Sequence, residues 1–90
     1  MYKVDWAESA MHELTRLWLQ ANAELRKTIT AATHTIDTDL RDHPNESGES
    51  RDHGNRIYFA SPLCVTFRVE ESSKTSVVTT VWLMRPRKKR

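Results

Sequence analysis

Hydrophobic residues in the first half of the chain recur at helical spacing. One stripe covers about residues 7–21 and a second begins at Leu25, and within each the apolar positions fall mostly three or four residues apart. A turn near Asn22 separates them, and the second stops after His43, because the residue before Pro44 disfavours helical geometry. The pattern predicts a helical hairpin with apolar positions Ala10, Leu14, Leu17, Trp18 and Ala21, then Leu25, Ile29, Ala32, Ile36 and Leu40.

A short strand, Tyr2 to Asp5, is predicted ahead of the first helix. Asp5 is a residue type that caps helices, and Glu8 follows it by three positions. Together they form the sequence of a capping box, in which each side chain accepts a hydrogen bond from the other residue's backbone.

The hydrophobic period changes from helical to alternating after residues 42–55, which read DHPNESGESRDHGN and which we expect to be a solvated connection. Apolar residues then alternate over 56–60 and 63–70, with a turn at Ser61 and Pro62, and a β-branched stretch covers 76–84. We expect the inner face of these strands to carry Ile57 and Phe59, then Leu63, Val65, Phe67 and Val69, then Val77, Thr79, Val81 and Leu83.

The expected architecture is α+β: an N-terminal strand, a helical hairpin and a three-stranded antiparallel meander, with both helices on one face of a twisted sheet. The N-terminal strand would pair with the last strand. The other face would stay open and, by strand parity, would carry Arg56, Tyr58 and Ala60, then Cys64, Thr66 and Arg68, then Val78, Thr80 and Trp82.

Length and charge limit the chain to one domain with a basic tail. Ninety residues suffice for a single small core, which we assign to residues 1–84. These residues hold nine Lys or Arg against twelve Asp or Glu, and the five basic residues of 85–90 (RPRKKR) bring the net charge to +2. The basicity of the tail predicts a local contact with a polyanion rather than a uniformly cationic nucleic-acid binder.

The sequence holds no apolar run near the ~20 residues that cross a bilayer, and its beginning is too acidic for a signal peptide. We therefore expect a cytoplasmic protein without membrane contact. The single cysteine, Cys64, excludes an intramolecular disulfide.

Two interpretations of the open face remain. Guanidinium groups pair with phosphates and aromatic rings stack on unpaired bases, so Arg56, Arg68, Tyr58 and Trp82 would suit a single-stranded nucleic acid, with Arg87 and Lys88 of the tail as further contacts. Alternatively, Arg68 pairs with Glu70 and Trp82 covers a partner's helix.

Other arrangements of reactive residues are weaker. A nucleophilic Cys64 needs an adjacent base, and the four histidines (12, 34, 43 and 53) are not near it in sequence. Cys64, His43 and His53 match no compact zinc-ligand spacing, and Asp37 and Asp39 point to different sides of a helix. We expect no metal and no cofactor.

The order of elements and several residues resemble the RelE/ParE superfamily of toxins from bacterial type II toxin–antitoxin modules, including plasmid stabilisation proteins. The resemblance spans nearly the whole chain, with no single diagnostic motif. It rests on Tyr2-Lys3-Val4-Asp5-Trp6, Ala10, Leu14, Ile36, Leu40, Pro44, Gly48, Arg56, the strand from Leu63 to Val69, and Val77 to Arg85.

The resemblance implies catalytic candidates for a metal-independent ribonuclease. Arg56 matches a basic position on the first meander strand and Arg85 an arginine at the end of the last, and both would stabilise charge on a scissile phosphate. Tyr58 would transfer a proton if Arg56 or Arg68 lowered its pKa. The sequence departs from the family nucleases at Cys64, where they carry an arginine, at Tyr58, where they carry a second basic residue, and in lacking their C-terminal tyrosine or histidine.

Two activities therefore stay open. RelE-like relatives are ribosome-dependent mRNA endoribonucleases, whereas ParE-like relatives inhibit DNA gyrase; a member that has lost activity and only binds protein is the third outcome. Whether the chain is an enzyme is left undecided. The resemblance implies a cognate antitoxin encoded nearby, with ribosome and mRNA or gyrase as target, and a homodimer as one free form.

Overall fold

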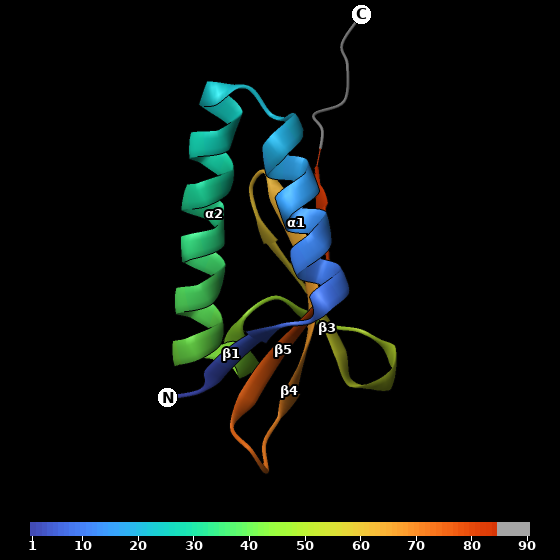
Figure 1. Cartoon of the computed structure of the whole chain (residues 1–90). Coiled ribbons are helices and arrows are strands. Elements are labelled where there is room, and N and C mark those ends of the chain that lie inside the picture. Colours follow the sequence, from blue (N-terminus) through green and yellow to red (C-terminus); the bar gives the residue numbers. More distant parts are fainter. Residues whose placement is uncertain (85–90) are drawn as a thin grey trace, which may run out of the picture.

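The computed structural model describes residues 1–84, which form two helices and a five-stranded sheet. The candidates Arg85, Arg87 and Lys88 lie outside the described residues. Strand β1 (Lys3–Trp6) leads into helices α1 (Glu8–Gln20) and α2 (Ala23–Asp42), which lie side by side as a hairpin (Figure 1). The meander consists of β3 (Asn55–Ala60), β4 (Leu63–Glu70) and β5 (Thr75–Leu83). The predicted helices and strands are present, with ends shifted by one or two residues.

The sheet has the order β1-β5-β4-β3-β2, with β1 parallel to β5 and the other pairs antiparallel. Lys3 pairs with Thr75 and Trp6 with Val78, so the first and last strands are neighbours, as expected. Both helices pack on one face, and the predicted α+β class is confirmed.

The predicted capping box is wrong. Asp5 belongs to β1, and Ala7 stands at the N-cap of α1 without a side-chain hydrogen bond. The strand extends through Trp6, which pairs with Val78 and donates its indole Nε1 to Asp37 Oδ1 of α2 at 2.9 Å. At α2, Asn22 Oδ1 accepts from Leu25 N at 2.9 Å, which is an ordinary N-cap.

The predicted solvated connection contains structure of its own. Two short 3-10 helices, η1 (Pro44–Glu46) and η2 (Asp52–Gly54), flank the two-residue strand β2 (Glu49–Ser50), which pairs with Ile57 and Arg56 on the sheet edge. Pro44 and Ser47 are buried. Polar composition hid this ordering because backbone pairing and side-chain hydrogen bonds, rather than apolar burial, hold most of the segment.

The face assignment is wrong for β3 and for part of β5. Tyr58 lies opposite Val65 on the helix side, so Tyr58, Ala60 and Arg56 point away from the open face that we predicted for them. Phe59 is 51% exposed on that open face, although its hydrophobicity predicted the core.

In β5 the cause is a bulge opposite Thr66 and Phe67. An extra residue in one strand reverses the alternation of side chains beyond it. Val78 is therefore fully buried opposite Phe67, whereas Val77, opposite Arg68, faces outward. The predicted inner positions Val81 and Leu83 and the predicted outer positions Thr80 and Trp82, all C-terminal to the bulge, are correct.

The core lies between the helices and the sheet. Its largest fully buried side chains are Phe67, Ile29, Ile36, Leu40, Leu63, Val65 and Val78. Ser76 is also buried, and its Oγ donates to the Leu40 carbonyl at 2.9 Å, which ties the end of α2 to β5.

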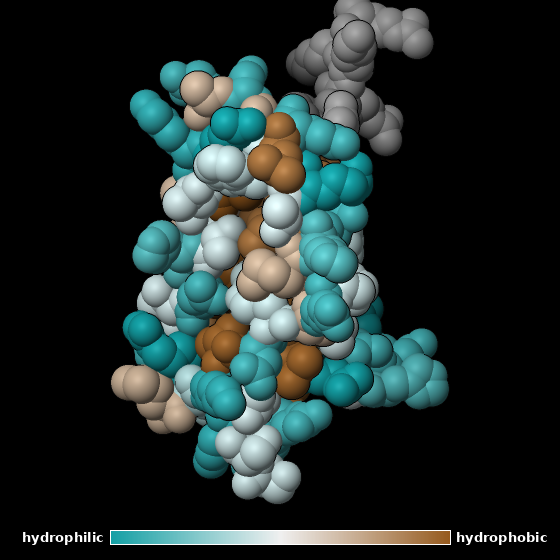
Figure 2. All heavy atoms as spheres, in the orientation of Figure 1, coloured by the Kyte–Doolittle hydropathy of each residue, from teal (hydrophilic) through white to brown (hydrophobic). Residues whose placement is uncertain are grey.

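A groove of about 350 Å³ runs between α1 and α2 on the outer side of the hairpin. Hydrophobic side chains are visible deep between the two helices (Figure 2). Leu14 and Ile29 line the groove, and Trp18 closes one end by donating Nε1 to Thr30 Oγ1 at 3.3 Å. Neither helix of residues 1–84 is long and apolar enough to cross a membrane.

Candidate binding surface on the open sheet face

An apolar row crosses the open face of the sheet. Phe59, Cys64 and Trp82 are register partners on β3, β4 and β5, so their side chains lie on the same face. Phe59 and Trp82 are 51% and 40% exposed, whereas Cys64 between them is fully buried. Two large rings left open to solvent on one sheet face are typical of a surface that binds a partner.

A hollow lined by hydroxyl groups adjoins this row. Thr66, Thr79 and Thr80 come together because the β5 bulge sets two threonines against one on β4. Thr66 Oγ1 lies 2.8 Å from Thr79 Oγ1 and also contacts Thr80 Oγ1. The hollow has a volume of about 470 Å³, and Ile57 contributes an apolar wall.

The loop of residues 51–55 supplies the polar wall of the hollow. Arg51, Asp52, His53 and Asn55 line it. Arg51 Nη1 donates to Glu49 Oε1 at 3.1 Å, and His53 has the left-handed backbone angle φ of 62°. Burial raises the pKa of the Cys64 thiol, and the positive charge of the Arg51 guanidinium opposes this shift by less.

Arg56 is engaged with its own loop rather than with the open face. Its guanidinium donates through Nε to the Ser47 carbonyl at 3.0 Å, through Nη1 to Ser50 Oγ at 2.9 Å, and through Nη2 to the Gly48 carbonyl at 3.2 Å. All three bonds reach residues just before or within β2.

Tyr58 is likewise engaged on the helix side, where its hydroxyl donates to Asp39 Oδ2. Burial, with this hydrogen bond and the negative charge of Asp39, raises the pKa of Tyr58 to about 12. The environment therefore raises the pKa of the phenol, whereas base catalysis at neutral pH needs a lowered pKa. His43 Nε2 lies 3.3 Å from the other Asp39 oxygen.

The remaining described candidates are separate. Arg68 is on the open face, 3.6 Å from Glu70, which matches the alternative interpretation of this arginine. Within residues 1–84, Arg56 and Tyr58 lie on the helix side of the sheet, whereas Trp82 lies on the open face. Residues 1–84 hold no group of three or more His, Cys, Asp or Glu that could bind a metal ion.

Sequence reasoning missed Phe59, Arg51 and Thr79 as members of this surface, and it did not place His53 there. The signal for the loop residues was faint: two glycines, Gly48 and Gly54, bracket them, and both have positive φ angles of 69° and 77°. Such angles indicate a chain that turns sharply at both ends of a built loop.

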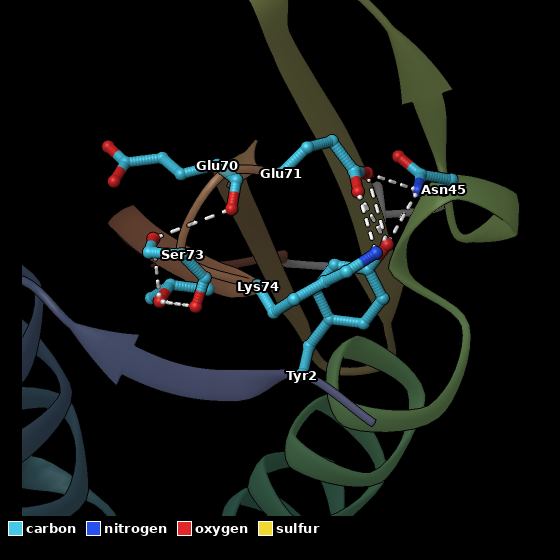
Figure 3. A network of polar contacts seen from close by, with 7 residues as sticks. Tyr2, Asn45, Glu70, Glu71, Ser73 and Lys74 are labelled. Carbon is cyan, nitrogen blue, oxygen red and sulfur yellow. Dashed lines mark hydrogen bonds and ion pairs between the residues drawn. The ribbon is translucent and has the colours of Figure 1, made fainter.

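A polar network joins η1 and the beginning of the chain to the β4–β5 turn (Figure 3). Glu71, in the β4–β5 turn, accepts from Tyr2 Oη at 3.0 Å and from Asn45 Nδ2 of η1 at 2.8 Å. Lys74 Nζ donates to the same carboxylate at 3.3 Å and lies 5.1 Å from the centre of the Tyr2 ring. These hydrogen bonds lower the pKa of Glu71, with Asn45 the largest cause.

The backbone arrangement matches solved toxin structures along nearly the full length of both chains. A chain of the chromosomal ParDE toxin–antitoxin system from P. aeruginosa has a TM-score of 0.75 at 18% identity, covering 94% of this chain and 98% of that one. A chain of the RelBE2 toxin–antitoxin complex from Mycobacterium tuberculosis gives 0.72 at 18%, covering 91% and 90%. The isolated E. coli RelE toxin gives 0.66 at 16%, covering 97% and 88%.

This chain has the RelE/ParE-type toxin fold. The likeness is one of structure, since no family model and no curated protein matches the sequence. These neighbours include both a RelE toxin and a chain of a ParDE system, and a shared fold does not by itself determine function.

Proposed function

We propose that this protein is the toxin component of a type II toxin–antitoxin module, and that it acts by binding a protein target through its open sheet face, in the manner of ParE-like gyrase inhibitors. The toxin role is supported by the RelE/ParE-type fold. The observation that carries the binding mode is the exposed pair Phe59 and Trp82 on that face.

The positions of Arg56 and Tyr58 support binding over cleavage. The Arg56 guanidinium already donates hydrogen bonds to Ser47, Gly48 and Ser50. Tyr58 lies under α2 with a raised pKa, where it would not accept a proton from RNA at neutral pH.

The second candidate is a metal-independent mRNA endoribonuclease. The hollow favours it, because Arg51 and His53 beside three threonine hydroxyls offer groups for phosphate binding and proton transfer. In that case Arg85 would act on the scissile phosphate, as the sequence resemblance implies, whereas Arg56, which the resemblance also implies, lies on the helix side and does not line the hollow.

In both cases we expect a cognate antitoxin as partner. Its bound segment would combine apolar side chains for Phe59 and Trp82 with acidic ones for Arg51. The groove between α1 and α2 is a second apolar surface for the same segment.

Induced expression in bacteria, with pulse labelling of protein and DNA synthesis in one culture, tests the proposal. DNA synthesis halting first supports the binding toxin. Translation halting first, with relief by the Arg56→Ala, Arg85→Ala double variant, supports the endoribonuclease instead. Normal growth without the neighbouring antitoxin gene would refute the toxin role.

A further inference from the structure

The segment from Ser47 to Gly54 crosses the edge of the sheet. Ser47 is buried on the helix side, where its Oγ donates to the His43 carbonyl at 2.9 Å. Glu49 and Ser50 then pair with the edge of β3. Beyond them, Arg51 and His53 line the hollow on the opposite face. The segment therefore links the two faces of the molecule.

Arg56 holds this segment from the helix side. Its three donors reach acceptors on residues 47, 48 and 50, at 2.9 to 3.2 Å. A planar guanidinium can bond several acceptors in a fixed arrangement, whereas the ammonium of lysine is a point charge on a flexible stem. The geometry thus uses a property that only arginine supplies.

Backbone contacts also hold the loop in place. Gly48 packs so closely on β3 that a Cβ there would lie 2.1 Å from the Ile57 carbonyl oxygen. Arg51 N donates to the Asn55 carbonyl at 2.6 Å and closes the turn that contains His53. With Arg56 in place, little freedom remains between Ser47 and Asn55.

We propose that Arg56 is a positioning residue: it fixes residues 47–54 from the helix side, so that Arg51 and His53 are held in the polar wall of the hollow on the open face. The positioning role is independent of the toxin proposal. The use of Arg51 and His53 in target recognition rests on the proposed function.

Amide hydrogen exchange tests the positioning. In Arg56→Lys, exchange of residues 47–54 should rise by about tenfold or more, while the amides of β4 and β5 keep their wild-type protection. Arg16→Lys is the matched control, since Arg16 is exposed on α1 and pairs there with Glu13; it should leave residues 47–54 unchanged. Unchanged exchange of the loop in Arg56→Lys, or an equal rise throughout the sheet, would overturn the proposal.

Growth arrest by the induced protein tests what the loop does. Arg51→Gln with His53→Asn should abolish arrest, and asparagine is chosen because it tolerates the left-handed angle of His53. Arg56→Lys should weaken arrest alone and add nothing to the double variant. Arrest lost in Arg56→Lys but intact in the double variant would assign a direct role to Arg56 and overturn the positioning role. If the wild type arrests nothing, the proposed function fails while the exchange experiment still decides the positioning.

Discussion

Two glycines with nearly the same backbone angle carry very different constraints. Gly48 and Gly54 have φ angles of 69° and 77°, yet only Gly48 faces a neighbour that a side chain would strike. At Gly54, no atom of another described residue in 1–84 lies within 4 Å of where a Cβ would be. Substituting each glycine by alanine therefore separates the cost of a left-handed backbone angle from the cost of a steric clash.

We predict that Gly48→Ala destabilises the fold by at least about 3 kcal/mol, since the clash with Ile57 adds to the ~1–2 kcal/mol of a left-handed alanine. Gly54→Ala, the matched control, should lose only the conformational part, about 1 kcal/mol. Urea unfolding of both variants measures the difference. Equal losses would contradict the close packing of Gly48.

Tyr58 predicts an alkaline limit to stability. Its pKa is raised from 10.0 to about 12, so the contribution of the neutral phenol is complete below pH 10 and is lost as pH rises toward 12. Tyr58→Phe should cost about 1 kcal/mol at neutral pH through the lost hydrogen bond and should remove this part of the alkaline decline. Denaturant midpoints from pH 7 to 12 check it. A variant with the same alkaline slope as wild type would disprove the assignment.

At the scale of elements, hydrophobic spacing was a good guide to helices and strands and a poor one to faces. The stripes of α1 and α2 and the alternation in β4 each have one apolar side, and that side packs on the core except at Trp18, which is 39% exposed. Both faces of β3 carry some apolar residues, so its alternation does not show which face is buried. The register with β4, which cannot be read from the sequence, places Tyr58 on the helix side and Phe59 on the open face. In β5 the bulge reverses which alternate side chains face the helices, and no glycine or proline in that strand indicates a bulge.

The candidate site was predictable only in part for the same reason. Trp82 and Arg68 lie on β5 and β4 segments whose parity was correct, and both are on the predicted face. The predicted positions of Arg56 and Tyr58 were wrong because we assigned the two faces of β3 the wrong way round. Arg51 and His53 lie in a loop whose path depends on hydrogen bonds from Arg56, so no local pattern could place them.

The bulge makes neighbouring valines unequal. Val78 is fully buried against the helices and Val77 is partly exposed on the other face. We predict that Val78→Ala costs about 2 kcal/mol, from lost transfer energy and an unfilled cavity, whereas Val77→Ala costs well under 1 kcal/mol. Thermal unfolding of the two variants checks this order. The reverse order would mean that β5 alternates without a bulge.

The network around Glu71 predicts sensitivity to acid. Its pKa is lowered from 4.5 by hydrogen bonds from Asn45, Tyr2 and Lys74, so its stabilising contribution is present above pH 4.5 and is lost as pH falls through the folded-state pKa. Glu71→Gln should lower stability at neutral pH and flatten the acid decline. Glu70→Gln is the control, because within residues 1–84 the Glu70 side chain makes only a 3.6 Å surface contact with Arg68. Equal acid profiles for both variants would argue against the network.

At the scale of the whole molecule, the exposed large apolar side chains of residues 2–84 lie on the open sheet face and on α1. Phe59 and Trp82 lie on the sheet, and Met11 and Leu19, which are 44% and 61% exposed, lie on the helix. Both pairs are exposed apolar side chains and they differ in location, so comparing them tests which surface binds a partner.

We predict that Phe59→Ser with Trp82→Ser weakens antitoxin binding by at least about a hundredfold, because buried aromatic anchors dominate interface energies. Met11→Ser with Leu19→Ser should change it by less than about tenfold. Isothermal titration of each variant with the proposed antitoxin gives both values, and circular dichroism controls for folding. A larger loss in the helix pair would move the principal interface to α1.

The pairing of β1 with β5 also sets the order of events during synthesis. The ribosome makes β1 first, yet the only strand that β1 pairs with in residues 1–84 is the last one described. Until Thr75 to Leu83 has emerged, β1 has no strand partner and α1 lacks the strand on which it rests. Contacts between such distant segments form late and slowly. A chain cut short before β5 would therefore leave its first strand unpaired, so that a truncated product of this gene would not present the assembled open face.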